Sequence, residues 1–447
     1  MRILLNLPTI HAFDISPEHE YPLGLLSITS YLKARIPDAD VKIIIGLLSP
    51  VDVESFRPDV IGYSVLSPFF TIVADQIKQF AQMYPRMVFI IGGHHITYIP
   101  QNMPKECTVG VLGEGEVSFY GICKLISENI ALAPANLSAI RGIQYWNGDE
   151  LVSTGPIEKC IEVFPHITHY ELCEFKTAKK IRYHLMTSRG CPYRCRFCSS
   201  SPFWKKIRYN SAEATVDQIE YIVSKFGPSV IHIFDDLMIA NKERLKKIHE
   251  LIIQKGIHKR VSFECWVAGS DFDIEAAQLL KEMNFKAVSI AIESGSPKIY
   301  RYLKGNWNSP QQNAVAVGIA NRFGFQVRVA VIVGSPDETV DDMEMTYKLL
   351  KQLKVAGGAV SVLKPFPGSL LWKEAKSQGI VSDTMADWGS IESNDLSNPK
   401  TIFLGKKADR QETLRYFNTI TTLLRRKSIV SKWKRRALKI VTAIFHF

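Results

Sequence analysis

The sequence predicts an α/β protein: a doubly wound parallel sheet of the flavodoxin-like type, then a partial (β/α)6 barrel similar to a TIM barrel, then a helical extension. Two observations lead to this prediction. Short apolar runs alternate with segments of helical period in two separate series. Polar or glycine-rich residues follow many of these runs, as they do where α/β sheets bind ligands. We expect an N-terminal domain at residues 1–135, a linker at 136–180, the barrel at 181–375 and the extension at 376–447.

The composition is that of a globular protein. Of the 447 residues, 46% are apolar and 22% are charged, which excludes a largely disordered or collagen-like chain. No run of 18 apolar residues suggests a transmembrane span, and the apolar stretch at the start is too short for a secretory signal. The eight cysteines are spread along the chain, so we expect free thiols and a cytoplasmic location rather than a disulfide scaffold.

The positive charge is concentrated at one end. Twelve basic and two acidic residues lie from Gly405 onward, so nearly all of the net charge of +11 belongs to the last 43 residues. A nucleic-acid partner for the whole protein is therefore not expected. The final stretch places apolar residues at helical spacing with basic residues between them, which fits a helix docked on the barrel or a peripheral contact with the inner membrane face. The apolar residues are Ile429, Trp433, Ala437, Ile440, Val441 and Ile444.

The first series of elements predicts a five-stranded parallel sheet. Helical segments at 22–37, 70–85 and 116–130 separate its apolar runs, which lie at 2–8, 40–47, 59–67, 87–93 and 108–113. Several of these runs end in polar or glycine residues. They are Ser64, then Gly92, Gly93, His94 and His95, then Gly113, Glu114 and Gly115. Each stretch alone is typical of a tight turn, but together on one edge they favour a ligand site.

A nicotinamide cofactor is not expected at this edge. The glycine-containing run at 113–116 follows the last strand rather than the first, and it lacks the G-x-G-x-x-G spacing. In the linker, two strand-like runs flank Asn147 and Gly148, which predicts a β-hairpin. Cys160 and Cys173 have no partner motif there, and we interpret both as structural.

The second series predicts the barrel. Apolar runs at 229–239, 260–269, 287–296, 327–339 and 356–369 follow a first run at the start of the region, with helical segments such as 213–226 and 274–283 between them. Polar residues at the carboxyl ends of such strands are where chemistry is expected.

Three cysteines open the barrel region. Cys191, Cys195 and Cys198 form a C-x3-C-x2-C pattern. A structural zinc normally takes four ligands, typically as two pairs, and no fourth cysteine is close. Three cysteines on an iron–sulfur cube leave one iron open for substrate, as a catalytic cluster requires. A structural zinc or inert thiols remain the alternative.

The stretch GCPYRCRFCSS, at 190–200, resembles the cluster loop of radical S-adenosylmethionine (SAM) enzymes. The resemblance implies that the three cysteines hold a 4Fe-4S cluster, that SAM chelates the fourth iron, and that reduction yields a 5′-deoxyadenosyl radical which abstracts hydrogen from the substrate. It also implies that Phe197 lies near the adenine, and that an external donor such as flavodoxin or ferredoxin supplies the electron.

The resemblance extends to residues after three later strands. Asp235 and Asp236 match the position that holds the SAM amino group, although alone such a pair is typical of a solvated turn. Glu293 and Ser294 match the strand end that faces the SAM ribose or carboxylate. Gly334 and Pro336 match the strand end beside the adenine.

The N-terminal region resembles the cobalamin-binding domain that precedes the radical SAM barrel in one large class. The resemblance rests on the stretches at 21–33, 59–67, 90–97 and 113–116. The cobalt-ligating D-x-H-x-x-G pattern is absent, although His11 and His19 lie in the corresponding loop. The resemblance therefore implies base-off cobalamin without a protein histidine ligand. His94 and His95 either line the corrin or are loop histidines without a ligand role.

The resemblance implies an enzyme that transfers a methyl group from methylcobalamin to a carbon of a small molecule, such as a lipid, tetrapyrrole or natural-product intermediate. A methylthiotransferase would need a further cysteine triad, but only Cys107 and Cys123 lie in the N-terminal domain. No cysteine follows Cys265, which disfavours an auxiliary cluster. An anaerobic cyclase or rearrangement enzyme like the Mg-protoporphyrin monomethyl ester cyclase stays as an alternative, as does a non-catalytic cobalamin or redox sensor.

Overall fold

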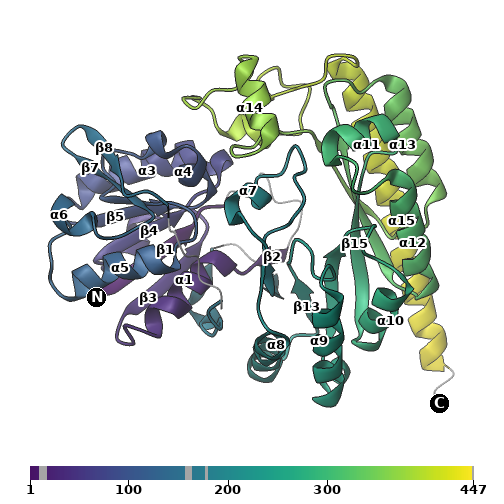
Figure 1. The fold of residues 1–447 in the computed structure, drawn as a ribbon, viewed down its shortest axis with the longest axis horizontal. Helices are drawn as coiled ribbons and strands as arrows, with labels where there is room; N and C mark the ends of the chain where they lie inside the picture. Colours follow the sequence, from purple (N-terminus) through teal and green to yellow (C-terminus); the bar gives the residue numbers. More distant parts are fainter. Residues whose placement is uncertain (10–17, 157–163, 177–179, 445–447) are drawn as a thin grey trace.

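The structure, a computed structural model, describes residues 1–9, 18–156, 164–176 and 180–444 (Figure 1). Of residues 18, 19, 180 and 434–444 it describes the backbone alone. His11 and Cys160 lie outside the described residues, as does the side chain of His19. Figure 1 shows two α/β units side by side, with α14 above the space between them and α15 along the outer face of the second unit.

The first unit is a doubly wound sheet, as the sequence predicts. Its strand order is β8-β7-β6-β5-β4-β1-β3-β9, and the five strands β3, β1, β4, β5 and β6 run parallel. The chain order reverses between β1 and β4, which is the switch point where such sheets bind ligands. The strands are β1 Arg2–Leu7, β3 Asp40–Ile45, β4 Val60–Ser64, β5 Val88–Gly92, β6 Val109–Val111, β7 Ile143–Asn147, β8 Glu150–Ser153 and β9 Cys173–Phe175.

Helices cover both faces of this sheet, which explains why its central strands are mostly apolar. Along β1, Ile3 and Leu5 face the core shared with α1 and α5, whereas Leu4 faces the core shared with α2 and α3. The predicted hairpin is confirmed, because β7 and β8 pair antiparallel and extend the sheet edge. The helices are α1 Leu23–Lys33, α2 Pro50–Phe56, α3 Phe70–Met83, α4 His94–Tyr98, α5 Glu116–Ser127 and α6 Pro134–Leu137.

The second unit is an open barrel of parallel strands in the order β17-β16-β15-β14-β13-β10-β2. The barrel strands are β10 Lys180–Leu185, β13 Val230–Ile233, β14 Ser262–Val267, β15 Phe285–Glu293, β16 Gln326–Val333 and β17 Gly358–Val362, and a separate ribbon pairs β11 Ser188–Arg189 with β12 Arg208–Tyr209. The helices are α7 Ser200–Trp204, α8 Ala212–Phe226, α9 Lys242–Gln254, α10 Ile274–Glu282, α11 Pro297–Lys304, α12 Pro310–Arg322, α13 Val340–Gln352, α14 Leu370–Ser377 and α15 Arg410–Ile444.

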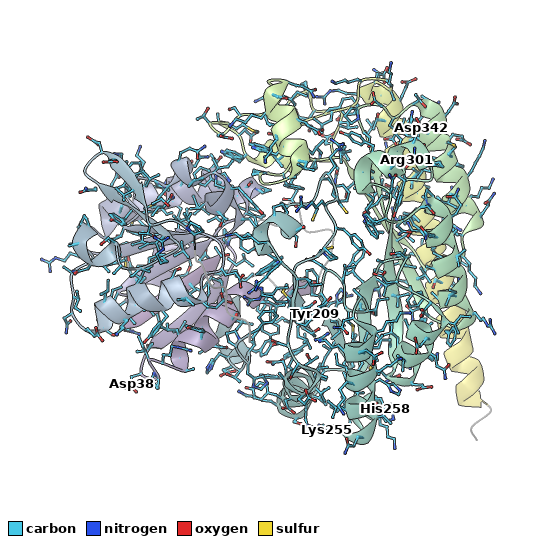
Figure 2. The ribbon with its side chains drawn as sticks, viewed as in Figure 1. Asp38, Tyr209, Lys255, His258, Arg301 and Asp342 are labelled. Atoms are coloured by element: carbon cyan, nitrogen blue, oxygen red, sulfur yellow. The ribbon has the colours of Figure 1, made fainter. Side chains whose placement is uncertain are left out.

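Side-chain caps fix where most barrel helices begin. In each case an oxygen of the residue before the helix accepts a hydrogen bond from a backbone N–H in the first turn, which such N–H groups otherwise lack. These residues are Ser211, Asn241, Asp273, Ser296, Ser309, Thr339 and Ser369. In Figure 2, Arg301 and Asp342 mark the end of the barrel where the strands finish, and Lys255 and His258 mark the opposite end.

The two units exchange strands, which the sequence analysis did not predict. Strand β2, Glu18–Glu20, leaves the first unit and pairs in parallel with β10 of the barrel. Strand β9, from the predicted linker, pairs in parallel with β3 of the first sheet. In the described part of the chain, no helix has the length and apolar character that crossing a membrane requires.

Candidate active site between the two units

The cysteine loop joins β11 to α7 at the end of the barrel where the strands finish. Backbone hydrogen bonds hold it from both sides: Arg196 N donates to Leu303 O at 2.8 Å, and Leu371 N donates to Arg196 O at 2.9 Å. Gly190 precedes the first cysteine with φ +91°, and a Cβ there would lie 2.6 Å from the carbonyl oxygen of Lys206. Any other residue at Gly190 would therefore push the loop away from β12.

The three cysteines lie on this one loop and are partly exposed. Cys195 and Cys198 each add to the electrostatic cost of ionising Cys191. Burial raises the pKa of Cys191 to about 12 and that of Cys195 to about 11. Thiolates at these positions would need a positively charged partner such as iron.

The thiols do not form a ready site for one ion. Among the described residues, no three His, Cys, Asp or Glu side chains are placed to hold a single metal ion. The other described cysteines are Cys107, Cys123, Cys173 and Cys265, and each lies outside the loop. Three soft donors without a fourth fit three corners of an iron–sulfur cube better than a closed zinc site.

The two aspartates after β13 have different surroundings. Asp235 is buried, and its carboxylate accepts hydrogen bonds from Thr187 N and Thr187 Oγ1, both at 2.5 Å, and from Ser188 N at 3.1 Å. It therefore holds the strand that leads into the cysteine loop. Asp236 is exposed, accepts only from Ser200 Oγ at 2.8 Å, and lies close enough to Cys191 and Cys198 to affect their ionisation.

Glu293 ends β15 in a left-handed conformation, with φ +55°. Its carboxylate forms an ion pair with Lys304 Nζ at 2.9 Å, and both side chains are almost fully buried. Burial opposes the charge of Lys304, but Glu293 and Cys195 outweigh it and raise the pKa of the ammonium. Ser294 points away from this site, because its hydroxyl lies 3.2 Å from Thr346 Oγ1 inside the barrel wall.

The turn after β16 is held by Glu338, which the sequence analysis did not single out. The backbone N–H groups of Gly334 and Ser335 both donate to Glu338 Oε2, at 2.6 and 3.1 Å. Burial raises the pKa of Glu338 to about 7. Pro336 packs on the C-terminal segment, where its carbonyl oxygen accepts from Lys406 N at 3.0 Å.

A cavity lies beside Phe197 at the ends of β16 and β17. Its walls include Ile332, Val362, Lys364 and Phe366. Burial lowers the pKa of Lys364 to about 8, and its ammonium donates to the carbonyl oxygen of Ser393.

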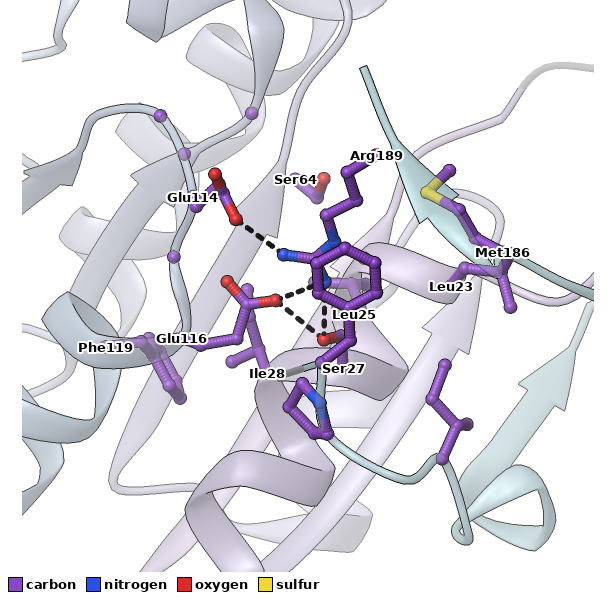
Figure 3. A pocket seen from close by; sticks show the side chains of 18 of the residues that line it. Leu23, Leu25, Ser27, Ile28, Ser64, Glu114, Glu116, Phe119, Met186 and Arg189 are labelled. Atoms are coloured by element: carbon purple, nitrogen blue, oxygen red, sulfur yellow. Dashed lines mark hydrogen bonds and ion pairs between the residues drawn. The ribbon is translucent and has the colours of Figure 1, made fainter. Parts of the chain in front are cut away.

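A second, mostly apolar pocket lies where the strand ends of the first sheet face the barrel (Figure 3). Most of the predicted residues of the first unit line it: Ser64, Gly92, Gly93, His94, Gly113, Glu114 and Gly115. From the barrel side come Leu185, Met186, Arg189, Phe203 and Trp204. Gly93 has φ +94°, and a Cβ there would lie 2.7 Å from Val65 N, so only glycine fits this turn.

The two adjacent histidines have different surroundings. His94 lines the pocket, and its ring stacks on Phe203 at 4.2 Å between centroids. Burial lowers the pKa of His94 to about 4, so its imidazole is neutral at pH 7. His95 is fully buried behind it, where Nδ1 lies 3.0 Å from Ser67 Oγ and the ring stacks on Phe70. The structure thus places His95 in the core and not in the pocket.

A buried ionic network joins the two units at the pocket wall (Figure 3). Arg189 donates to Glu114 Oε2 and to Glu116 Oε1, both at 2.6 Å, and to Ser27 Oγ at 2.9 Å. Arg208 pairs with Glu114 as well. Burial opposes the charge of Glu116, but Arg189 more than offsets it and lowers the pKa of that carboxyl. Neither arginine was predicted from the sequence. The pattern that could have indicated Arg189 is its position directly before Gly190 and Cys191.

Comparison with known families decides the identity. The family model of the radical SAM superfamily matches residues 185–350, and that of the B12 binding domain matches residues 16–122. The chain belongs to the radical SAM proteins that carry a B12 binding domain. The cysteine loop lies in the radical SAM domain, and the seven lining residues of the first sheet lie in the B12 binding domain.

Curated relatives match most of this chain. The chain is 29% identical to an uncharacterized methyltransferase of Pyrococcus horikoshii, over 85% of this chain and 84% of that one. It is 21% identical to the anaerobic magnesium-protoporphyrin IX monomethyl ester cyclase of Cereibacter sphaeroides, over 86% of this chain and 65% of the other.

Two solved structures share the fold. The radical S-adenosylmethionine methyltransferase TsrM from Kitasatospora setae, with cobalamin and a 4Fe-4S cluster bound, matches with a TM-score of 0.68 at 16% identity, over 84% of this chain and 78% of that one. The cobalamin-dependent S-adenosylmethionine radical enzyme OxsB, with aqua-cobalamin and S-adenosylmethionine bound, matches with a TM-score of 0.70 at 15% identity. The match covers 93% of this chain and 65% of that chain. The predicted combination of a doubly wound sheet with an open radical SAM barrel is confirmed.

Proposed function

We propose that this radical SAM enzyme is a cobalamin-dependent methyltransferase that adds a methyl group to an unactivated carbon of a small molecule. One observation carries the proposal. A single segment, residues 189–204, begins at Arg189 in the wall of the pocket at the strand ends of the first sheet. It then forms the cysteine loop and returns to the same pocket with Phe203 and Trp204. The sites for two cofactors thus share one short piece of chain.

On the barrel side, the thiols of Cys191, Cys195 and Cys198 would hold three irons of a 4Fe-4S cluster. Exposed Asp236, beside two of these thiols, would accept hydrogen bonds from the SAM ammonium. Phe197 would flank the adenine in its adjoining cavity. Asp235 would act by positioning the loop, since Thr187 and Ser188 already occupy its oxygens.

On the other side, Ser64 and the glycines at 92, 93, 113 and 115 would let the corrin approach the sheet edge closely. His94 would meet the corrin as a neutral imidazole. The pocket continues between the sheet and α1 and α5, past Leu5, Ile90 and Phe119, which offers an apolar path for the detached nucleotide base. When bound, cluster and SAM would supply a 5′-deoxyadenosyl radical and cobalamin a methyl group; the apolar walls would exclude water.

The remaining partners follow from this chemistry. We infer that a reduced flavodoxin or ferredoxin supplies the electron. The substrate is a small molecule with a C–H bond that only a radical can break. Its class is not set by the relatives, because one of them acts on a magnesium porphyrin ester and TsrM binds tryptophan.

The first test uses anaerobic, cluster-reconstituted protein titrated with hydroxocobalamin under reducing conditions with SAM. We expect near-equimolar base-off binding and formation of 5′-deoxyadenosine. Alanine at Cys191, Cys195 or Cys198 should abolish 5′-deoxyadenosine and leave cobalamin binding intact, whereas Cys173→Ala should keep both. Undiminished 5′-deoxyadenosine from the loop variants would overturn the assignment, and a wild-type protein that binds cobalamin without cleaving SAM would indicate a sensor.

A second candidate is an oxidative cyclisation, which the similarity to the magnesium-protoporphyrin ester cyclases favours. The two reactions consume SAM differently. A methyltransferase releases S-adenosylhomocysteine together with 5′-deoxyadenosine, whereas a cyclase releases only the latter. The ratio of the two products therefore separates them.

A further inference from the structure

The first part of the last helix, α15, docks on the barrel. Tyr416, Ile420 and Leu424 are buried against β17 and α13, and Thr413 is buried near the start of the helix. Further along, Lys427 Nζ donates to the carbonyl oxygens of Lys351 and Leu353 at 3.2 and 2.7 Å, and Ser428 lies against Gly357. The backbone continues as helix to Ile444, and Figure 1 shows this final part at the outer side of the barrel.

Beyond Ser428, large apolar side chains face water. Ile429 is 48% exposed, Val430 52% and Trp433 71%. At about 100° per residue, the centre of these three lies about 140° around the helix from the buried residues Tyr416, Ile420 and Leu424. They therefore do not extend the docking face but form a second apolar face, directed away from the barrel. In the sequence, the same spacing continues through Ala437, Ile440, Val441 and Ile444.

Basic residues accompany this second face. Eight lysines and arginines lie between Arg425 and Lys439, and no acidic residue follows Glu412. Arg425, Arg426 and Lys432 are exposed. A helix with tryptophan and isoleucine on one side and only positive charge elsewhere is complementary to an anionic bilayer, where the charges meet headgroups and the apolar side chains enter the acyl boundary.

We propose that residues 428–444 form an interfacial helix that docks the protein on an anionic lipid bilayer. Other partners explain less. Nucleic acid would satisfy the positive charge but leave Trp433 and Ile429 in water. A second copy of the helix would cover the apolar face but bring the two sets of positive charges together. The proposal is independent of the enzyme's chemistry, so it stands or fails apart from the proposed function.

The test is flotation of the full chain with vesicles of phosphatidylcholine alone or with about one third phosphatidylglycerol. We expect binding only to the anionic vesicles, and weakening with added salt. The triple variant Ile429→Ser, Val430→Ser, Trp433→Ser should bind at least about tenfold more weakly. The matched control is Val315→Ser on α12, an equally exposed apolar residue at 63%, which should bind like the wild type. Circular dichroism confirms that the variants are folded.

Three outcomes would overturn the proposal. The first is no binding to anionic vesicles by the wild type, or equal binding by the triple variant. The second is binding to duplex DNA or RNA at equal strength that the triple variant retains, which would assign the helix to nucleic acid. The third is a dimer in solution that the triple variant loses, which would assign it to a second copy of the chain.

Discussion

The phenolic hydroxyl of Tyr98 donates a 2.6 Å hydrogen bond to the carbonyl oxygen of Ser199, the residue that follows the last cysteine of the cluster loop. One turn earlier on the same helix, His94 stacks on Phe203 of α7. Helix α4 of the B12 binding domain thus contacts the cysteine loop directly. These contacts tie the position of the loop to that of the pocket, which His94 lines.

Removing the Tyr98 hydroxyl should separate the effect of this contact on the pocket from its effect on general stability. We expect Tyr98→Phe to lower the free energy of unfolding by about 1 kcal/mol, because one partly buried hydrogen bond is lost. Tyr221→Phe is the control, since Tyr221 makes the same 2.6 Å bond to Thr168 O and is not among the residues that line the pocket; it also accepts from exposed Lys225 Nζ at 2.9 Å. Both variants should lose similar stability in urea, but Tyr98→Phe alone should also weaken cobalamin binding. Equal cobalamin affinities would show that the bond has no role in the pocket.

Breaking the buried ionic network should be costly. Arg189→Met removes the ion pair of buried Glu116 and leaves Glu114 paired with Arg208, for an expected loss of about 3–5 kcal/mol in unfolding free energy. Adding Glu116→Gln should restore part of this loss. Lys255→Met, which removes an exposed pair with Asp217 and Glu220, should cost less than about 1 kcal/mol. Similar losses in the two methionine variants, measured by urea denaturation, would contradict the role of burial.

Stability should fall as the solution becomes mildly acidic. Burial lowers the pKa of His94, His184 and His232 to about 4 each, below the value of about 6.5 in an unfolded chain. The unfolded chain therefore binds protons that the folded chain does not. Stability is full above about pH 6.5 and is lost as the pH falls toward about 4, by up to about 1.4 kcal/mol per pH unit for each histidine.

The fully internal His184 gives the sharpest check of this pH dependence. Urea denaturation between about pH 7 and pH 4.5 should show a smaller slope for His184→Gln than for the wild type. A slope unchanged by this substitution, or a wild-type protein that gains stability on acidification, would contradict the assignment.

The two neighbouring aspartates should respond differently to amide substitution. Asp236→Asn should raise the dissociation constant of SAM about tenfold and leave the fold intact, because its exposed carboxylate, which accepts one hydrogen bond from Ser200, can also accept from the ammonium. Asp235→Asn should destabilise the protein, because an amide cannot accept all three hydrogen bonds from Thr187 and Ser188. Calorimetric SAM titration and thermal unfolding together test this. If the Asp236 variant binds SAM tightly while the Asp235 variant is stable but binds SAM weakly, Asp235 and not Asp236 contacts SAM.

Much of this architecture is visible in local sequence patterns. The C-x3-C-x2-C spacing placed the cluster loop, and strand ends such as Gly92 and Gly93 marked the pocket, because both signals lie within a few consecutive residues. The parallel, doubly wound character of the first sheet followed from its alternating apolar runs and helical segments, since parallel strands joined by helices have few allowed topologies.

The missed features all depend on contacts between distant parts of the chain. Glu114 and Arg189 are 75 positions apart, and nothing near either residue predicts that both charges are buried. Asp235 and Asp236 are neighbours, so only the direction of the strand end decides which one points inward. Strand β2 consists of Glu18, His19 and Glu20 and has no apolar residue to mark it.

The strand exchange also has a consequence for the order of synthesis. Strand β2 leaves the ribosome about 160 residues before its partner β10, a delay of roughly 8 to 32 s at 5–20 residues per second. Strand β3 likewise waits for β9. During this interval the first sheet can form with one edge unpaired, and the two units interlock only after the nascent chain has passed β10. Either unit expressed alone would keep an open sheet edge, a template for pairing with other chains.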